Sequence, residues 1–300
     1  MSIETLAYEP ARREEVFGLL DRVRGSATDP RVFDWWFDGN PVGPRTIVLA
    51  QDAGRILGVL GASFYRAVVD GRETLAALPL WAVTDPEARG RGIFQRLNGE
   101  IERVARENGA TVELGFTNRL AGPIYIAKLG WLDVHRLRIW ARPVVPFGRR
   151  DASDLERFGD EHEAAYRAAA QRLRSHFVRD TAYLNWRYAD SPNGYVLLAS
   201  RNGYAVLGRK PFRGIETAYV ADLVAPTFRE TRWLLRRCIR CARGARVLLA
   251  LMPAVHAGAY RSLGFLPTPE TIRLIGHALQ GRVPVGAGAW HFTLGDTDYF

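Results

Sequence analysis

The sequence predicts an α/β fold made of two copies of one domain. Residues 35–43 and 186–194 share a motif in which a tryptophan precedes a proline by six residues and a glycine by eight. Each half also alternates short apolar runs with segments whose apolar residues recur at helical spacing. With 300 residues, 47% of them hydrophobic and 24% charged, the chain can fill the cores of two domains.

The repeat continues in order along both halves. Residues 47–54 and 196–203 each begin with a four-residue apolar run and end on a glycine, which is typical of a strand and its turn. Residues 129–131 and 263–265 both read Leu-Gly-aromatic. The separation between matching segments falls from 151 to 134 residues along the chain, because the second copy lacks residues between its strands.

The elements of the first copy follow from periodicity and turn signals. A helix is predicted over residues 9–24, where apolar side chains form one stripe. Strands are predicted next, and then a second amphipathic helix that ends at Asn108-Gly109. The predicted strands are 45–50, 55–65, 74–83, 111–116 and 134–141, the second helix is 92–108, and a short helix ends at Gly130.

The second copy is predicted to repeat this order, with a helix at 231–243 and a strand at 245–251. Residues 143–154, rich in Pro, Arg and Gly, contain the predicted boundary. We therefore predict domains over residues 1–147 and 148–300. The repeated tryptophans are expected in the cores, since both copies keep them.

Composition narrows the classes of function. The net charge of +9 comes almost wholly from arginines that are scattered through both halves, whereas nucleic-acid binding usually gathers basic residues in one patch. Cys238 and Cys241 lie within a predicted helix, which favours two incidental thiols over a redox pair. The longest apolar run is far shorter than the roughly 20 residues that span a bilayer, and the N-terminus has no signal-peptide pattern. We expect a cytoplasmic protein that binds neither nucleic acid nor membrane.

The most informative segment joins a predicted strand to a predicted helix. It contains Arg89, Gly90, Arg91 and Gly92 directly before the helix begins. Such a turn directs free backbone N–H groups and the positive end of the helix dipole at one point, and glycines let an anion approach the backbone closely. The two arginines add positive charge. These features predict a pyrophosphate-binding loop.

This loop resembles that of the GNAT superfamily, which includes the histone and aminoglycoside acetyltransferases. The family's loop reads Q/R-x-x-G-x-G/A, and residues 89–94 fit it in every place but the last, where Phe94 replaces a small residue. A second GNAT motif, N-x-x-A-x-x-x-Y, matches at Asn118 and Tyr125, before the Leu-Gly-Trp ending. The resemblance is closest to GNAT proteins with paired domains. It implies two tandem domains, each a mixed, mostly antiparallel sheet flanked by helices.

The resemblance also implies a coenzyme site and a mechanism. Acetyl-CoA or another acyl-CoA would bind in the first domain, an amine would attack the thioester directly, and no metal would be needed. Tyr125 is the candidate acid, and Glu113 on a neighbouring strand is the candidate base. The implied coenzyme-binding residues are Trp81, Ala82, Val83, Arg89, Gly90, Arg91, Gly92, Ile93, Phe94 and Asn118.

The second copy lacks the glycine loop, so coenzyme binding there is expected to be poor. Its Asp222 is interpreted as a structural carboxylate rather than a functional one. The acceptor is expected to be an amine of a small molecule or amino sugar; its identity, the acyl chain length and the oligomeric state stay open. Two alternatives are a non-catalytic acyl-CoA sensor or scaffold and an aminoacyl transferase of the Fem type that uses charged tRNA.

Overall fold

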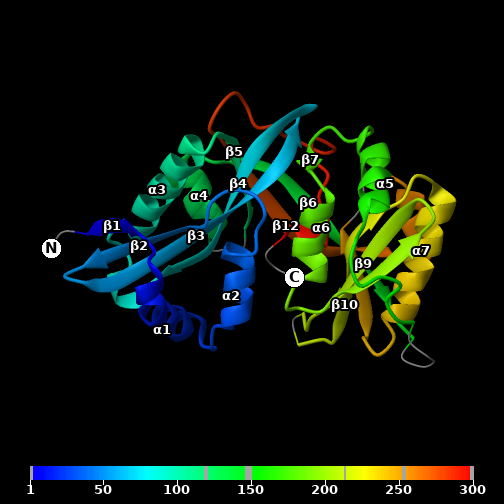
Figure 1. Ribbon diagram of the computed structural model, residues 1–300, viewed down its shortest axis with the longest axis horizontal. Helices are drawn as coiled ribbons and strands as arrows, with labels where there is room; N and C mark the ends of the chain where they lie inside the picture. Colours follow the sequence, from blue (N-terminus) through cyan, green and yellow to red (C-terminus); the bar gives the residue numbers. More distant parts are fainter. Residues whose placement is uncertain (1–2, 118–120, 146–150, 213, 252–254, 298–300) are drawn as a thin grey trace. The chain divides into compact units, whose positions relative to one another are not determined.

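The computed structural model describes residues 3–117, 121–145, 151–212, 214–251 and 255–297, and the chain forms two compact units (Figure 1). Neither unit is one uninterrupted segment. The first unit comprises Met1–Ala67, Glu73–Val134 and Leu274–Val283, and the second comprises Val68–Arg72, His135–Arg273 and Pro284–Phe300.

The first unit is a sheet with helices. Its strands follow the order β1 (Glu4–Ala7), β2 (Thr46–Asp52), β3 (Arg55–Val69), β4 (Arg72–Thr84), β5 (Ala110–Thr117) and the end of β12 (Leu266–Ala278). β1 to β3 pair antiparallel, and β4 pairs parallel with β5. The helices are α1 (Arg13–Arg24), α2 (Pro30–Phe37), α3 (Ile93–Glu107) and α4 (Ala121–Leu129), with the 3-10 turns η1 (Pro10–Arg12) and η2 (Pro86–Ala88).

The second unit repeats this plan. Its strands follow the order β6 (Leu132–Pro143), β11 (Val247–Leu251), β10 (Thr217–Val224), β9 (Gly203–Arg209) and β8 (Val196–Ser200), and β10 and β11 form its parallel pair. The helices are α5 (Asp160–Ala170), α6 (Thr181–Leu184), α7 (Phe228–Cys241) and α8 (Ala257–Arg261), and the short elements are β7 (His176–Phe177), η3 (Asn185–Ala189) and η4 (Leu294–Asp296).

Equivalent positions in the two halves adopt the same backbone conformation. Gly43 and Gly194 have φ of 75° and 66°, and Gly130 and Gly264 have φ of 70° and 81°. Only glycine adopts this left-handed region at little cost, which explains why both halves keep it there. The repeated tryptophans are buried as predicted, Trp35 with 6% and Trp186 with 4% of its surface exposed.

The last strand of each half lies where the sequence pattern did not predict it. Residues 134–141 were expected to complete the first domain, but from His135 onward this strand belongs to the second unit, where Ala141 pairs with Leu249 of β11. The first unit contains instead the end of β12, and the N–H of Leu279 donates to the carbonyl oxygen of Thr111 at 2.9 Å. Periodicity predicts that a segment is a strand but not which strand it pairs with.

One helix stripe fills each core. In the first unit Ile93, Leu97 and Ile101 of α3 pack on β2 and β3, so closely that a Cβ at Gly58 would lie 2.6 Å from Ile93. In the second unit α7 fills the core with leucines and with the two cysteines. Both thiols are buried and free, and burial raises the pKa of Cys241 to about 11, which suits inert packing residues.

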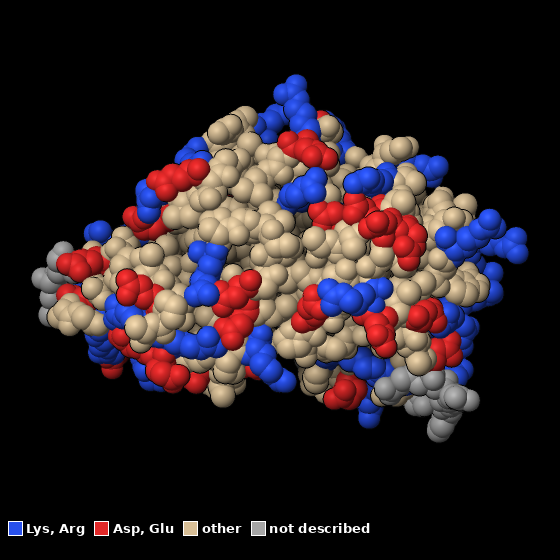
Figure 2. All heavy atoms as spheres, viewed as in Figure 1, with Lys and Arg blue, Asp and Glu red and all other residues tan. Residues whose placement is uncertain are grey.

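Charges of both signs are mixed over the face of the molecule in Figure 2. Arginines of the chain pair with carboxylates, as between Arg103 and Glu107 or Arg13 and Asp34. Among the described residues, no helix is both long enough and apolar enough to cross a membrane.

Candidate active site

The two parallel strands of the first unit pair only at one end. β4 and β5 pair from Leu75 opposite Ala110 to Ala77 opposite Glu113. Beyond this point β4 continues to Thr84 and β5 to Thr117 without further pairing. The two strands therefore separate, which leaves backbone groups of β4 and β5 available to an extended ligand.

Trp81 marks a break in β4 within this separated part. Its φ of 61° lies in the left-handed region, which a tryptophan rarely adopts and which costs about 1–2 kcal/mol. The indole ring is held by Phe33 and Phe37 at centroid distances of 5.4 and 5.8 Å, and the Arg24 guanidinium lies 4.3 Å above it. The surrounding aromatic residues thus hold Trp81 in place despite its strained backbone.

The loop after β4 leads directly into α3. Gly90 and Gly92 have φ of 80° and 73°, and a Cβ built at either residue would meet no atom within 4 Å. Gly92 is the N-cap and makes no side-chain cap, so the first N–H groups of the 15-residue helix have no capping side chain. Open space, free donors and the helix dipole coincide here, as an anion site requires.

The two arginines of the loop differ. The side chain of Arg91 is paired with Asp52 of β2 at 2.7 Å, which neutralises its charge and ties the loop to the sheet. Arg89 is exposed and has no ion pair among the described residues. Asp85 stabilises the loop by accepting hydrogen bonds from the Glu87 N–H at 3.0 Å and from the Arg55 guanidinium at 2.8 Å. Burial alone would raise the pKa of Asp85, but these hydrogen bonds outweigh it and hold the pKa below its usual value.

Comparisons with known proteins agree with this geometry. Residues 7–132 match the family described as acetyltransferase (GNAT) domain. The matched segment contains β4, the glycine loop, α3 and β5. No curated protein sequence matches the chain.

Solved structures of proteins named as acetyltransferases or as an N-myristoyltransferase share the fold over nearly the whole chain. A GCN5-related N-acetyltransferase from Kribbella flavida aligns with 92% of this chain and 71% of its own, at 16% identity and a TM-score of 0.68. A putative acetyltransferase from Pyrococcus horikoshii aligns over 96% and 92%, at 13% identity and a TM-score of 0.64. The N-myristoyltransferase of Saccharomyces cerevisiae with bound myristoyl-CoA aligns over 94% and 84%, at 11% identity and a TM-score of 0.65.

The second GNAT motif lies on α4. Tyr125 is buried. Its ring packs edge-on against Phe94 of α3, with the ring centroids 5.2 Å apart, and lies tilted against Trp131, with the centroids 4.6 Å apart. Phe94, which replaces the family's small residue, therefore fills the space between the start of α3 and this tyrosine. Asn118, the first residue of the motif, lies outside the described residues.

Glu113 lies in the closed part of the sheet. It is 2% exposed, and its carboxylate shares a small space with Glu102 of α3 and His277 of β12, whose ligand atoms all lie within 4.8 Å of one another. Burial and the nearby Glu102 raise its pKa to about 8, although Arg106 opposes them. Glu113 therefore holds a proton at neutral pH.

The same three side chains are a candidate metal-ligand set. Two hydrogen bonds from Arg106 already engage Oε1 of Glu102, at 2.7 and 3.1 Å, and Glu113 is protonated at neutral pH. A cation would have to displace that proton and lie beside the guanidinium. We assign no metal to this group.

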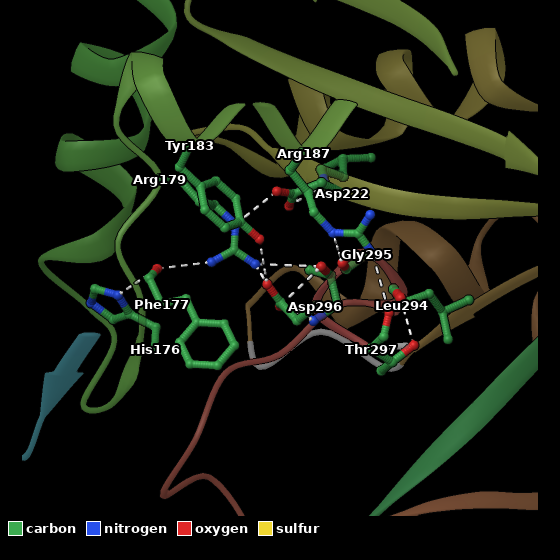
Figure 3. A network of polar contacts seen from close by, with 12 residues as sticks. His176, Phe177, Arg179, Tyr183, Arg187, Asp222, Leu294, Gly295, Asp296 and Thr297 are labelled. Atoms are coloured by element: carbon green, nitrogen blue, oxygen red, sulfur yellow. Dashed lines mark hydrogen bonds and ion pairs between the residues drawn. The ribbon is translucent and has the colours of Figure 1, made fainter. Parts of the chain in front are cut away.

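Sequence reasoning missed the polar network of the second unit, which Figure 3 shows. Arg179 is 1% exposed, and its guanidinium donates to Asp222, to Asp296 and to the carbonyl oxygen of Phe177 at 2.7, 2.7 and 2.9 Å. Tyr183 donates to the other oxygen of Asp296. Asp222 is thus a buried structural carboxylate of β10, and Arg179 connects it with Asp296 of η4.

Proposed function

We propose that the first unit binds acetyl-CoA or another acyl-CoA and transfers the acyl group to an amine of a small molecule or amino sugar. The observation that carries the proposal is the combination of an uncapped helix start with a pair of separated strands. The loop at α3 suits a pyrophosphate, and the open edge beside Trp81 suits the amides of pantetheine. A cytoplasmic location stays a prediction.

The proposed reaction is direct attack. The neutral amine nitrogen bonds to the thioester carbon, the carbon–sulfur bond breaks, and the coenzyme leaves as a thiolate. Holding both reactants side by side supplies much of the rate. Peptide N–H groups at the break in β4, over Trp81, Ala82 and Val83, are proposed to polarise the thioester carbonyl.

Two protons must move. The leaving thiolate takes one, for which Tyr125 is the proposed donor, since it lies between Phe94 at the start of α3 and Trp131 at the end of α4. The amine nitrogen, which becomes positively charged when it attacks, loses the other. Glu113 pairs with Ala77, four residues before Trp81, and is therefore roughly 13 Å along the strand from the proposed thioester. We propose that a water molecule, and not Glu113, accepts the amine proton.

A thiol-release assay tests the proposed function. The purified chain is incubated with acetyl-CoA and a panel of amino sugars and small amines, and free thiol is measured with and without each amine. We expect amine-dependent release that falls at least about tenfold in Tyr125→Phe, with Tyr65→Phe as a control for a buried tyrosine of β3 outside the site. Acetyl-CoA binding without release by any amine would favour the sensor or scaffold alternative instead.

A further inference from the structure

The second unit contains a pocket in the place that corresponds to the coenzyme slot of the first. β10 and β11 pair in parallel from Thr217 opposite Val247 to Tyr219 opposite Leu249 and then separate, as β4 and β5 do. The pocket lies beyond this point and is lined by the end of β10, by α5 and by the start of α8. The second copy has thus kept the strand separation without the phosphate loop.

Much of the pocket lining is apolar. Leu223, Val224 and Pro226 contribute to it, as do Leu173 and Ala169. The cavity volume is about 80 Å³, and the pocket is partly open to solvent. Such a site excludes water from the body of a ligand while leaving its polar end accessible.

Three hydrogen-bonding side chains of the lining have no partner among the described residues. The Nε2 atom of His256 is inaccessible to solvent and makes no hydrogen bond. The hydroxyl of Tyr260, a residue only 4% exposed, and the exposed guanidinium of Arg172 also have no hydrogen-bond partner in the described part of the chain. A buried polar atom without a partner is costly, so the Nε2 atom of His256 indicates a missing partner, whereas Arg172 is exposed and solvated by water.

The backbone at His256 supports a built site. This residue is the N-cap of α8 and has a φ of 60°, a conformation that costs about 1–2 kcal/mol for a residue with a side chain. The strain positions the imidazole in the pocket lining. His291, on the same lining, is neutral at pH 7 because burial lowers its pKa to about 4.

The charge of the lining selects the ligand. None of the described lining residues is an Asp or Glu, while Arg172, Arg179 and two histidines are present. The positive charge of Arg179 is already balanced. The buried network contains two arginines, Arg179 and Arg187, and two aspartates, Asp222 and Asp296. Arg172 therefore supplies the one uncompensated charge, and it is positive.

We propose that this pocket binds a small organic carboxylate, with its apolar body against β10 and its carboxylate on Arg172, His256 and Tyr260. The proposal is independent of coenzyme binding in the first unit. Without a phosphate loop, the pocket has no means of holding the nucleotide part of a coenzyme.

Calorimetry with hexanoate and its neutral analogue hexanamide tests the proposal. We expect hexanoate to bind, with hexanamide at least about tenfold weaker. Arg172→Gln and His256→Asn should each weaken hexanoate about tenfold, asparagine being chosen because it tolerates a positive φ. Arg236→Gln, an exposed arginine of α7 outside the pocket, should change nothing.

A second arm separates this pocket from the acyl site of the first unit. Gly92→Glu should leave hexanoate binding unchanged. The proposal is overturned if hexanoate does not bind, if hexanamide binds equally well, or if Gly92→Glu but not Arg172→Gln abolishes binding. Loss of acetyl-CoA binding alone would count against the proposed function and leave this pocket unaffected.

Discussion

At the residue scale, one ion pair distinguishes the two arginines of the glycine loop. Arg91 and Arg89 look equivalent in the sequence, but Arg91 is held by Asp52 while Arg89 has no partner among the described residues. A guanidinium that must leave a carboxylate gains less from a phosphate than one that is free. Asp52 precedes Arg91 by 39 residues, so this pairing could not be predicted from local pattern.

Arg89→Gln is expected to weaken acyl-CoA binding about five- to tenfold, and Arg91→Gln by less than about threefold, because a free charge contributes about 1–1.4 kcal/mol. Calorimetry at two salt concentrations checks this, since only Arg89→Gln should reduce the salt dependence. Equal losses in the two variants would show that Arg91 releases Asp52 and contacts the phosphates.

Glu113 predicts a pH dependence of stability. Its pKa is about 8 in the folded chain against 4.5 for an ordinary glutamate, so between these values the folded state holds a proton that the unfolded state has lost. This contribution to the free energy of unfolding therefore falls as pH rises from about 5 to 8 and is constant above that. Over this pH range the contribution to the free energy of unfolding changes by on the order of 4 kcal/mol.

Glu113→Gln should remove this slope and stabilise the chain at pH 8, which urea unfolding at several pH values measures. Glu107→Gln, at the exposed end of α3, is the control and should keep the slope. An unchanged slope in Glu113→Gln would mean that the carboxylate is ionised in the folded chain. Burial of Glu113 was not predictable from its strand pattern, because α3 and β12 cover it only in the folded structure.

At the scale of elements, the Arg179 network connects three segments of the second unit. Arg179, Asp222 and Asp296 are each at most 1% exposed and come from the residues before α6, from β10 and from η4. Removing one partner of a buried ion pair leaves an uncompensated charge and costs about 3–5 kcal/mol. The network therefore fixes the C-terminal segment against the second sheet.

Arg179→Met should lower the free energy of unfolding by about 3–5 kcal/mol in urea titrations. Arg157→Met, which breaks the exposed pair with Asp190, should cost less than about 1 kcal/mol and is the matched control. Similar losses of unfolding free energy in both variants would contradict a stabilising role for burial of the network.

The elements themselves were largely predictable, and their partners were not. The glycine loop, α3 and the strands around them follow from local chemistry, and the structure moves their ends by a few residues. α2, which carries Trp35 and Trp36, was not predicted because its eight residues contain too few turns to show a period. The pairing of β11 with β6 depends on residues more than a hundred positions apart.

At the scale of the molecule, the two units share a strand arrangement and differ at the start of the helix that follows it. Both units keep a parallel strand pair that separates, but only the first has a glycine loop with free helix N–H groups. In the second, Thr227 caps α7 by accepting from the Glu230 N–H at 3.2 Å, so that end is already occupied. We therefore expect each chain to bind one coenzyme, in the first unit.

The most direct test of this claim is calorimetric titration of the chain with acetyl-CoA. We predict one site per chain, lost in Gly92→Glu, which puts a carboxylate where the pyrophosphate binds. Gly109→Glu is the control, because Gly109 also has a positive φ and open space around it but lies at the other end of α3. Two sites per chain, or full binding by Gly92→Glu, would contradict the account.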